Sequence, residues 1–172
     1  MSWGKFVADQ IEYDLTHLDP FNITVPTVAP KPIKKDRIVR VTFGCHTFTR
    51  EWEDADLEHF RFEDEGHLRC FCPSRHALSV NLPDLIRQAA TGKVRFNNKR
   101  SPFLTVHNVP GSNGPYVIYF DAIKANSPGL DVVIDIRSAH SKPNYVDNGH
   151  KVGFATIIGL TAAGQKVERP KK

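Results

Sequence analysis

Apolar and polar residues alternate along most of this chain, with the two-residue period that is typical of half-buried β-strands. In the clearest run, Val39, Val41 and Phe43 share one face and polar residues occupy the other. The predicted strands are 37–48, 59–62, 67–72, 93–96, 103–107, 116–120, 132–139 and 152–160. Turn-forming Gly, Pro and Asn residues separate the later strands. The pattern predicts an α+β fold that is mainly an antiparallel sheet, in the form of a β-meander.

One segment near the middle of the chain, at about 82–91, has the 3.6-residue period of a helix. Leu82 and Ile86 belong to its apolar stripe. Asn81 is suited to the N-cap, and Gly92 stands where a C-terminal cap belongs. The sequence therefore predicts a single central helix that packs against the sheet.

The 172 residues are predicted to form one domain with an extension at each end. Residues 1–35 form an N-terminal arm with a Pro-rich extended segment, because its prolines disfavour helix. The pattern does not decide whether this segment packs as an edge strand or is a disordered linker. Residues 36–164 form the α+β domain, and residues 165–172 form a basic tail.

The composition favours a cytoplasmic protein. No apolar run approaches the roughly 18 residues that span a bilayer. Acidic residues follow the N-terminus closely, at Asp9 and Glu12, where a signal peptide would be apolar. The chain has three cysteines, and an odd number suits reduced thiols better than a disulfide framework. We therefore expect no membrane partner.

A group of cysteine and histidine residues is the most ligand-like feature. Zinc takes about four thiolate or imidazole ligands in a tetrahedral array. The candidates are Cys45, Cys70, Cys72 and His76. However, Cys70 and Cys72 are separated by one residue, whereas paired zinc ligands are usually separated by two to four. The alternative is that the cysteines are small core residues, and this is the favoured interpretation. No other cofactor is expected.

Charge is distributed unevenly along the chain, although the net charge is only +4. Residues 31–50 and 67–110 are basic, and the acidic segment 51–65 lies between them. Trp52 stands within the acidic segment, where an aromatic anchor surrounded by negative charge suits a basic protein partner. The alternative is a solvated surface loop without a partner.

Basic and aromatic residues also follow one another along the predicted strands. Cations neutralise phosphates, and rings stack on unpaired bases, so this combination suits RNA or single-stranded nucleic acid. The candidate nucleic-acid-binding residues are Arg69, Phe71, Arg75 and Lys142. The candidate catalytic residues, for metal-independent RNA cleavage, are His76, Arg137 and His140. The alternative is that these cations only coat the outer face of a half-buried sheet.

Several motifs carry a resemblance to known proteins. They are Phe43–Arg50 (FGCHTFTR), Arg69–Cys72 (RCFC) with Arg75, and Arg137–His140 (RSAH). Together they resemble a group of small uncharacterised bacterial proteins, over roughly residues 13–160. The stretch Ile136–Pro143 at the end of the meander resembles the ending of RelE-like ribonuclease toxins. This second resemblance implies a toxin-like endoribonuclease, but at the level of fold analogy only.

Three functions are thus compatible with the sequence. The first is binding of RNA or single-stranded nucleic acid, with cleavage as an extension. The second is a non-catalytic protein-interaction module, such as a defence, anti-defence or toxin-partner component. The third is a zinc-stabilised structural domain. The enzymatic form of the first requires His76, Arg137 and His140 to meet on one open surface.

Overall fold

The computed structural model of the chain describes residues 2–28, 30, 34–96, 102–145 and 150–167. Most of the predicted basic tail, residues 168–172, therefore lies outside the described residues. Within the described ranges, no helix is both long and apolar enough to cross a membrane.

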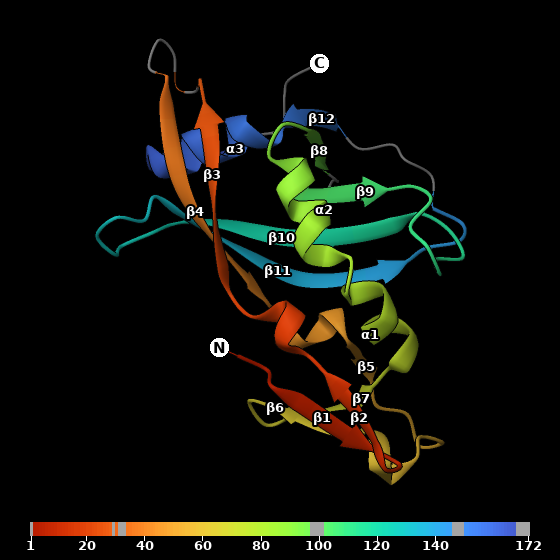
Figure 1. The fold of residues 1–172 in the computed structure, drawn as a ribbon. Coiled ribbons are helices and arrows are strands. Elements are labelled where there is room, and N and C mark those ends of the chain that lie inside the picture. Colours follow the sequence, from red (N-terminus) through yellow and green to blue (C-terminus); the bar gives the residue numbers. More distant parts are fainter. Residues whose placement is uncertain (1, 29, 31–33, 97–101, 146–149, 168–172) are drawn as a thin grey trace.

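A twisted seven-stranded sheet forms the larger part of the molecule, in the order β12-β8-β9-β10-β11-β4-β3 (Figure 1). Its strands are β3 (Phe21–Thr27), β4 (Lys35–Phe43), β8 (Lys93–Phe96), β9 (Pro102–Val106), β10 (Tyr116–Lys124), β11 (Val132–Ser141) and β12 (His150–Gly153). Strands β8 to β11 are consecutive antiparallel neighbours, as in the predicted meander. Strand β4 runs parallel to β11, so the sheet is not antiparallel throughout.

Strand β3 lies at the edge of this sheet and pairs with β4 over its whole length. It comes from the Pro-rich segment whose packing the sequence left undecided. Pro26 lacks a backbone N–H, and it is tolerated because β3 is an edge strand with no neighbouring strand on its outer side. Val25 is fully buried, so the strand also contributes to the core.

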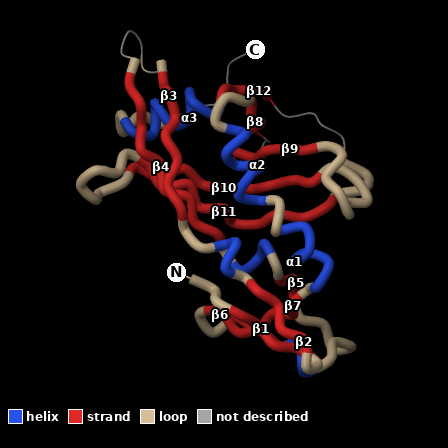
Figure 2. Tube along the Cα trace, viewed as in Figure 1, coloured by secondary structure: helices blue, strands red, loops and turns tan. Residues whose placement is uncertain are grey.

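A smaller three-stranded sheet, in the order β5-β7-β6, lies below the large one (Figure 2). Its strands are β5 (Thr49–Glu51), β6 (Arg61–Asp64) and β7 (His67–Phe71). A separate hairpin of β1 (Lys5–Ala8) and β2 (Ile11–Asp14) packs on it through aromatic rings. The β1–β2 and β6–β7 hairpins each turn through two residues with positive φ, as a two-residue turn between twisted strands requires.

Three α-helices are present among the described residues: α1 (Pro73–Ser79), α2 (Leu82–Ala89) and α3 (Phe154–Ala162). Helix α2 is the predicted central helix, and it crosses in front of β9, β10 and β11 (Figure 1). The prediction of a single helix was wrong, because α1 precedes α2 and α3 follows β12. Three short 3₁₀ turns complete the elements: η1 (Thr16–Leu18), η2 (Cys45–Thr47) and η3 (Glu58–Phe60).

The predicted strand at 152–160 is also corrected, since only β12 is extended and α3 begins at Phe154. Isoleucine and threonine residues favour strand locally, which explains the error. In the fold, Phe154, Ile157, Ile158 and Thr161 are buried, with the spacing of one helix face. That face packs against β3, β4 and β10, and this burial outweighs the local preference.

One hydrophobic core joins the two sheets. Phe48 and Phe71 from the smaller part belong to the same cluster as Phe120 and Ile136 from the larger. Trp3 also connects the parts, because its Nε1–H donates a hydrogen bond of 2.9 Å to the carbonyl of Phe43. The elements between the sheets, η2 and α1, are thus held firmly, and they carry the site described next.

Candidate functional site

The chain leaves β4 at Gly44 and turns through η2 beside β11. The Gly44 N–H donates to the carbonyl of Ile136 at 2.9 Å, and the Thr47 hydroxyl donates to the carbonyl of Gly44 at 2.8 Å. A Cβ at position 44 would lie 3.4 Å from the Ile136 carbonyl oxygen, which is an ordinary van der Waals contact. The strand predicted to reach residue 48 therefore ends at Phe43. Within the turn, His46 is exposed.

Two arginines from different elements donate hydrogen bonds to one residue, Thr49. Arg69 of β7 donates through Nε to the Thr49 hydroxyl at 2.7 Å. Arg75 of α1 donates through Nη1 to the Thr49 carbonyl at 2.6 Å and to the His46 carbonyl at 3.3 Å. Arg69 is only 9% exposed, and Arg75 is half-buried. Their guanidinium groups therefore lie close together at the junction of the two sheets.

Neither guanidinium has an acidic partner in the part of the chain that the structure describes, where ion pairs form at other arginines. Their hydrogen bonds are made to a hydroxyl and to backbone carbonyls, which carry no net charge. Burial lowers the pKa of Arg75, and Arg69 adds to this effect although the Cys72 thiol opposes it. A buried cation without a counter-ion is costly. An anionic ligand would remove that cost.

A bulge in β11 determines which of its residues face this junction. The pairing with β10 shifts by one residue between Tyr119 and Phe120, and Arg137 is the extra residue. Before the bulge the buried positions end at Ile136, and after it Ala139 is the buried residue. The alternation is thus reversed at the bulge. The residues on either side of Ala139 face away from the core.

His140 is the second of these residues, and it lies among polar and aromatic neighbours. Its Nδ1 is 3.3 Å from the hydroxyl of Ser138, and its ring is stacked beside that of Tyr119, with 6.0 Å between centroids. Lys142 Nζ donates to the Tyr119 hydroxyl at 2.7 Å and lies 5.0 Å from the centre of the Tyr119 ring. His140 therefore lies beside an aromatic ring that also contacts the cation of Lys142.

Electrostatics links these side chains further. Burial lowers the pKa of His140 to about 4, and the positive charges of Arg75 and Lys142 lower it as well. Burial also lowers the pKa of His46, with further contributions from Arg69, Arg137 and Arg75. Both imidazoles are therefore neutral at pH 7.

We call this group of side chains the cationic junction. Its members are His46, Arg69, Arg75, Arg137, His140 and Lys142. They come from η2, β7, α1 and β11, except Lys142, which directly follows β11, and η2 and α1 both pack against β11. Acidic groups are present at its margin: Arg137 lies 3.3 Å from Asp135 and 3.9 Å from Asp121, and Asp64 raises the pKa of His46 slightly against the other effects.

His76, a predicted catalytic residue, is turned to another part of the molecule. Its Nε2 is 2.9 Å from the carbonyl of Asp14, and its ring contacts Tyr13 and His17. These neighbours belong to the N-terminal hairpin and η1. His76 therefore joins α1 to that hairpin, and His46 is the second imidazole of the cationic junction.

Phe71 is also separated from the junction by burial. It is 1% exposed and stacks on Phe6, with 4.4 Å between ring centroids. The ring belongs to the core of the smaller sheet, so it offers no face to a base. Of the predicted nucleic-acid-binding residues, Arg69, Arg75 and Lys142 are those that the fold brings together.

The four proposed zinc ligands do not converge. Within the described ranges, which include all four, no group of three or more His, Cys, Asp or Glu residues is placed to hold a metal ion. Burial, followed by an interaction with Asp64, raises the pKa of Cys45 to about 12, and burial raises the pKa of Cys70. These two thiols are protonated at neutral pH, which suits the core interpretation of these cysteines.

A scan against models of protein families matches the YjaZ family over residues 5–162. This chain belongs to the YjaZ family. Neither the curated proteins nor the solved structures contain a match to it. The YjaZ match supports the predicted membership of a bacterial protein family, which was based on the motifs around Cys45, Cys70 and His140. The resemblance of the last strands to RelE-like ribonuclease toxins stays a prediction.

In this YjaZ-family chain, Trp52 lies apart from the cationic junction, in the loop after β5. The loop is fixed by Arg50, which pairs with Asp56 and lies 3.6 Å from Glu53. The Asp56 carboxylate also accepts a hydrogen bond from the Glu53 N–H at 2.8 Å. Trp52 is half-buried, and Leu57 is 59% exposed. Residues 52–57 of the acidic segment thus form a loop that these contacts hold in place.

His46 of the cationic junction, and Tyr116, on which the charge of Arg75 acts, were not among the site residues predicted from the sequence. In the sequence, His46 stands only within the motif Phe43–Arg50, and Tyr116 only at the start of a predicted strand. His46 carries no separate sequence signal, since Gly44 before it has an extended conformation that any residue can adopt. For Tyr116 there was no signal, because a sequence does not show whether a hydroxyl finds a partner.

Proposed function

We propose that this chain binds RNA or single-stranded nucleic acid, with the cationic junction holding the phosphates. The observation that carries the proposal is the pair Arg69 and Arg75, held on Thr49 without a carboxylate partner in the described part of the chain. Guanidinium groups form two parallel hydrogen bonds with phosphate oxygens. A bound phosphate would therefore supply the counter-charge that the fold does not.

The residues beside this pair favour a nucleic acid over a simple anion. Tyr119 and His140 are half-buried rings with 29° between their planes, next to the cation of Lys142. Rings of this kind stack on unpaired bases, and the lysine neutralises a neighbouring phosphate. The junction thus offers a base contact and a phosphate contact side by side.

The proposal is tested by fluorescence anisotropy with a labelled single-stranded RNA at roughly 50 and 200 mM salt. We expect binding to weaken steeply with salt, because phosphate contacts release counter-ions. Arg75→Gln and Lys142→Gln should each weaken binding by roughly tenfold. Arg61→Gln is the matched control, since Arg61 is exposed and paired with Glu58 and Glu63. Equal binding by Arg75→Gln and Arg61→Gln would refute the proposal.

Cleavage of the bound RNA is a narrower extension of this proposal. The neutral His140 ring would accept the proton of a 2′-hydroxyl as its oxygen attacks the neighbouring phosphorus. The bond to the 5′-oxygen breaks, that oxygen takes a proton from water, and the products are a 2′,3′-cyclic phosphate and a 5′-hydroxyl. Arg137 would stabilise the charge that develops on the phosphate. We expect RNA fragments in the presence of EDTA and their loss in His140→Ala. Intact RNA with the unaltered protein would rule out cleavage and leave binding unaffected.

A second candidate function is protein interaction through the acidic loop after β5. It is supported by the loop held by Arg50 and Asp56, which carries half-buried Trp52 and exposed Leu57 among carboxylates. An apolar anchor with an acidic rim suits a basic partner. Pull-down with the intact chain and with Trp52→Ala tests this candidate. Equal recovery of partner by both would remove it.

A further inference from the structure

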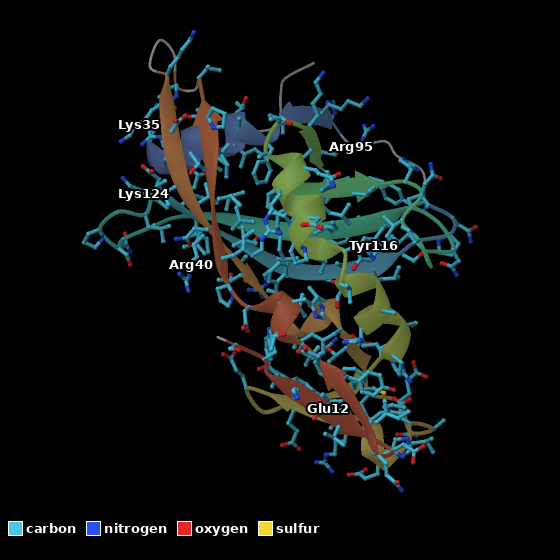
Figure 3. The ribbon with its side chains drawn as sticks, in the orientation of Figure 1. Glu12, Lys35, Arg40, Arg95, Tyr116 and Lys124 are labelled. Atoms are coloured by element: carbon cyan, nitrogen blue, oxygen red, sulfur yellow. The ribbon has the colours of Figure 1, made fainter. Side chains whose placement is uncertain are left out.

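Two histidines from separate elements meet where the N-terminal hairpin joins α1. His17 lies in η1 and His76 in α1, and their ring centroids are 5.6 Å apart, with 75° between the ring planes. Both side chains are half-buried. In Figure 3 the label of Glu12 gives the position of the hairpin, and α1 lies above it. Because an imidazole changes its charge near pH 6.5, a contact between two of them is sensitive to mild acid.

The hydrogen bonds of the two rings show which nitrogen carries the hydrogen. His76 Nε2 lies 2.9 Å from the carbonyl oxygen of Asp14, which can only accept, so Nε2 is the donor. The Ser79 hydroxyl donates to the His76 carbonyl at 2.7 Å, and it therefore accepts from His17 Nε2 at 2.8 Å. In both neutral rings Nδ1 is then the nitrogen that takes up a proton. Protonation thus adds a positive charge to each ring and retains both hydrogen bonds.

The acidic groups around the pair oppose this charge only in part. Burial lowers the pKa of His17 and the neighbouring His76 lowers it further, whereas Asp14 and Asp19 act in the opposite direction. The Asp14 carboxylate also accepts hydrogen bonds from the N–H and the hydroxyl of Thr16, at 2.8 and 2.7 Å. One added positive charge therefore has acidic neighbours, but a second one meets the first.

The other elements around the pair present apolar, aromatic or already bonded groups. Tyr13 of β2 and Phe71 of β7 place their rings 5.4 and 5.7 Å from the ring of His76. Arg75 of α1 is bonded to the carbonyls of Thr49 and His46. Helix α2 also packs against η1, and its Asp84 and Arg87 pair with each other at 3.0 Å.

Side-chain contacts hold the hairpin to the rest of the molecule. Strands β1 and β2 form a sheet of their own, so in the described part of the chain their ladder hydrogen bonds connect only each other. Phe6 stacks on Phe71 with 4.4 Å between ring centroids, and Tyr13 lies 4.7 Å from the same ring. A unit attached in this way can open without unfolding the large sheet.

We propose that His17 and His76 form a pH-sensitive latch, which holds the hairpin of β1 and β2 on α1 while the rings are neutral and releases it when both are charged. Two positive charges at this separation repel each other, and opening of the hairpin returns both rings to water. Release would expose the rings of Tyr13 and Phe71. Because α1 also carries Arg75, the latch connects the hairpin to the helix of the cationic junction.

The test is amide hydrogen exchange of the intact chain at about pH 7.5 and pH 5, corrected for the intrinsic exchange rates. We expect the protection of the hairpin amides to fall by roughly tenfold or more relative to that of β10 and β11. The reason is that each extra proton bound by the open state favours opening by up to about tenfold for each pH unit below 6.5. An unchanged relative protection would overturn the latch.

His17→Gln and His76→Gln test the two rings, because an amide keeps a hydrogen-bond donor but takes up no proton. Each variant should retain at about pH 5 the hairpin protection that it has at about pH 7.5. His107→Gln is the matched control, since His107 is exposed in the turn after β9, and it should lose protection like the unaltered chain. The same loss in all three variants would contradict the latch.

A second measurement requires no variant. The ring resonances of His17 and His76 are followed by nuclear magnetic resonance over the same pH range. We expect the loss of hairpin protection to coincide with the titration of these two rings, and a loss in a separate pH range would overturn the latch. Both tests are made without RNA, so their outcome leaves the proposed binding of nucleic acid unaffected.

Discussion

At the scale of single residues, His140 illustrates how position alone changes the chemistry of a side chain. Its ring is partly removed from water, and the positive charges of Arg75 and Lys142 act on it. Each of these effects disfavours the charged imidazolium. The sequence predicts His140 as an acid–base group, and in the fold its ring is uncharged at pH 7.

The depressed pKa of His140 predicts a pH dependence of stability. The ring titrates near 6.5 in the unfolded chain and near 4 in the folded one. Between these values the unfolded state binds more protons, so the free energy of unfolding falls as pH is lowered from 6.5 to 4. We expect His140 to contribute about 2 kcal/mol of this fall, after allowing for solvent around the half-buried ring.

The measurement is urea unfolding of the intact chain and of His140→Asn at several pH values. The pKa values of His17 and His46 are also lowered by burial, so the unaltered protein and the variant both lose stability with acid. The difference between their slopes isolates His140. Identical slopes would show that the ring titrates normally in the fold.

At the scale of elements, the parallel pairing of β4 and β11 brings η2 beside β11 and so creates the junction. Asp131, directly before β11, fixes this pairing where it begins. Its carboxylate accepts hydrogen bonds from the Ile38 N–H at 2.9 Å and from Arg37 Nη1 at 2.8 Å. Although burial opposes ionisation, these bonds lower the pKa of Asp131. One carboxylate thus connects both strands.

We predict that Asp131→Ala destabilises the fold by about 2–3 kcal/mol, because it leaves the mostly buried Arg37 and a backbone N–H without an acceptor. Urea unfolding measures the change. Asp84→Ala is the matched control, since Asp84 also pairs with an arginine but its side chain is 79% exposed. That variant should change stability by less than about 0.5 kcal/mol. Equal effects of the two variants would contradict the role assigned to Asp131.

At the scale of the whole molecule, the two sheets share one core although their strands do not pair with each other. Phe48 and Phe71 join the cluster that includes residues of the larger sheet, and Trp3 bonds to the end of β4. Domains with one core usually unfold in a single transition. The two sheets should therefore unfold together.

This prediction can be measured because both tryptophans, Trp3 and Trp52, lie in the smaller part of the molecule. Trp52→Phe leaves Trp3 as the single indole, packed against Phe48 at 5.2 Å between ring centroids. Its fluorescence reports on the smaller part, and far-ultraviolet circular dichroism reports on the whole chain. We expect coincident urea midpoints. Midpoints that differ clearly would mean that the parts unfold independently.

Much of the architecture could be predicted from the local pattern of apolar and polar residues. The alternation in β4, β10 and β11 and the capped helix α2 depend on neighbours in sequence, so they can be recognised without a fold. Helix α3 was missed because its isoleucines also suit a strand. Only the surface against which Phe154 and Ile158 pack decides between the two.

By itself, the sequence determined which side chains are available: the arginines, the histidines and the alternating strands that carry them. The tertiary structure alone decided which of them meet: His76 contacts the N-terminal hairpin, whereas His46 belongs to the cationic junction. The physical reason is that burial, counter-charge and hydrogen-bond satisfaction depend on residues far apart in the chain. The unpartnered hydroxyl of Tyr116 and the unpaired charge of Arg75 exist only once the strands are in place.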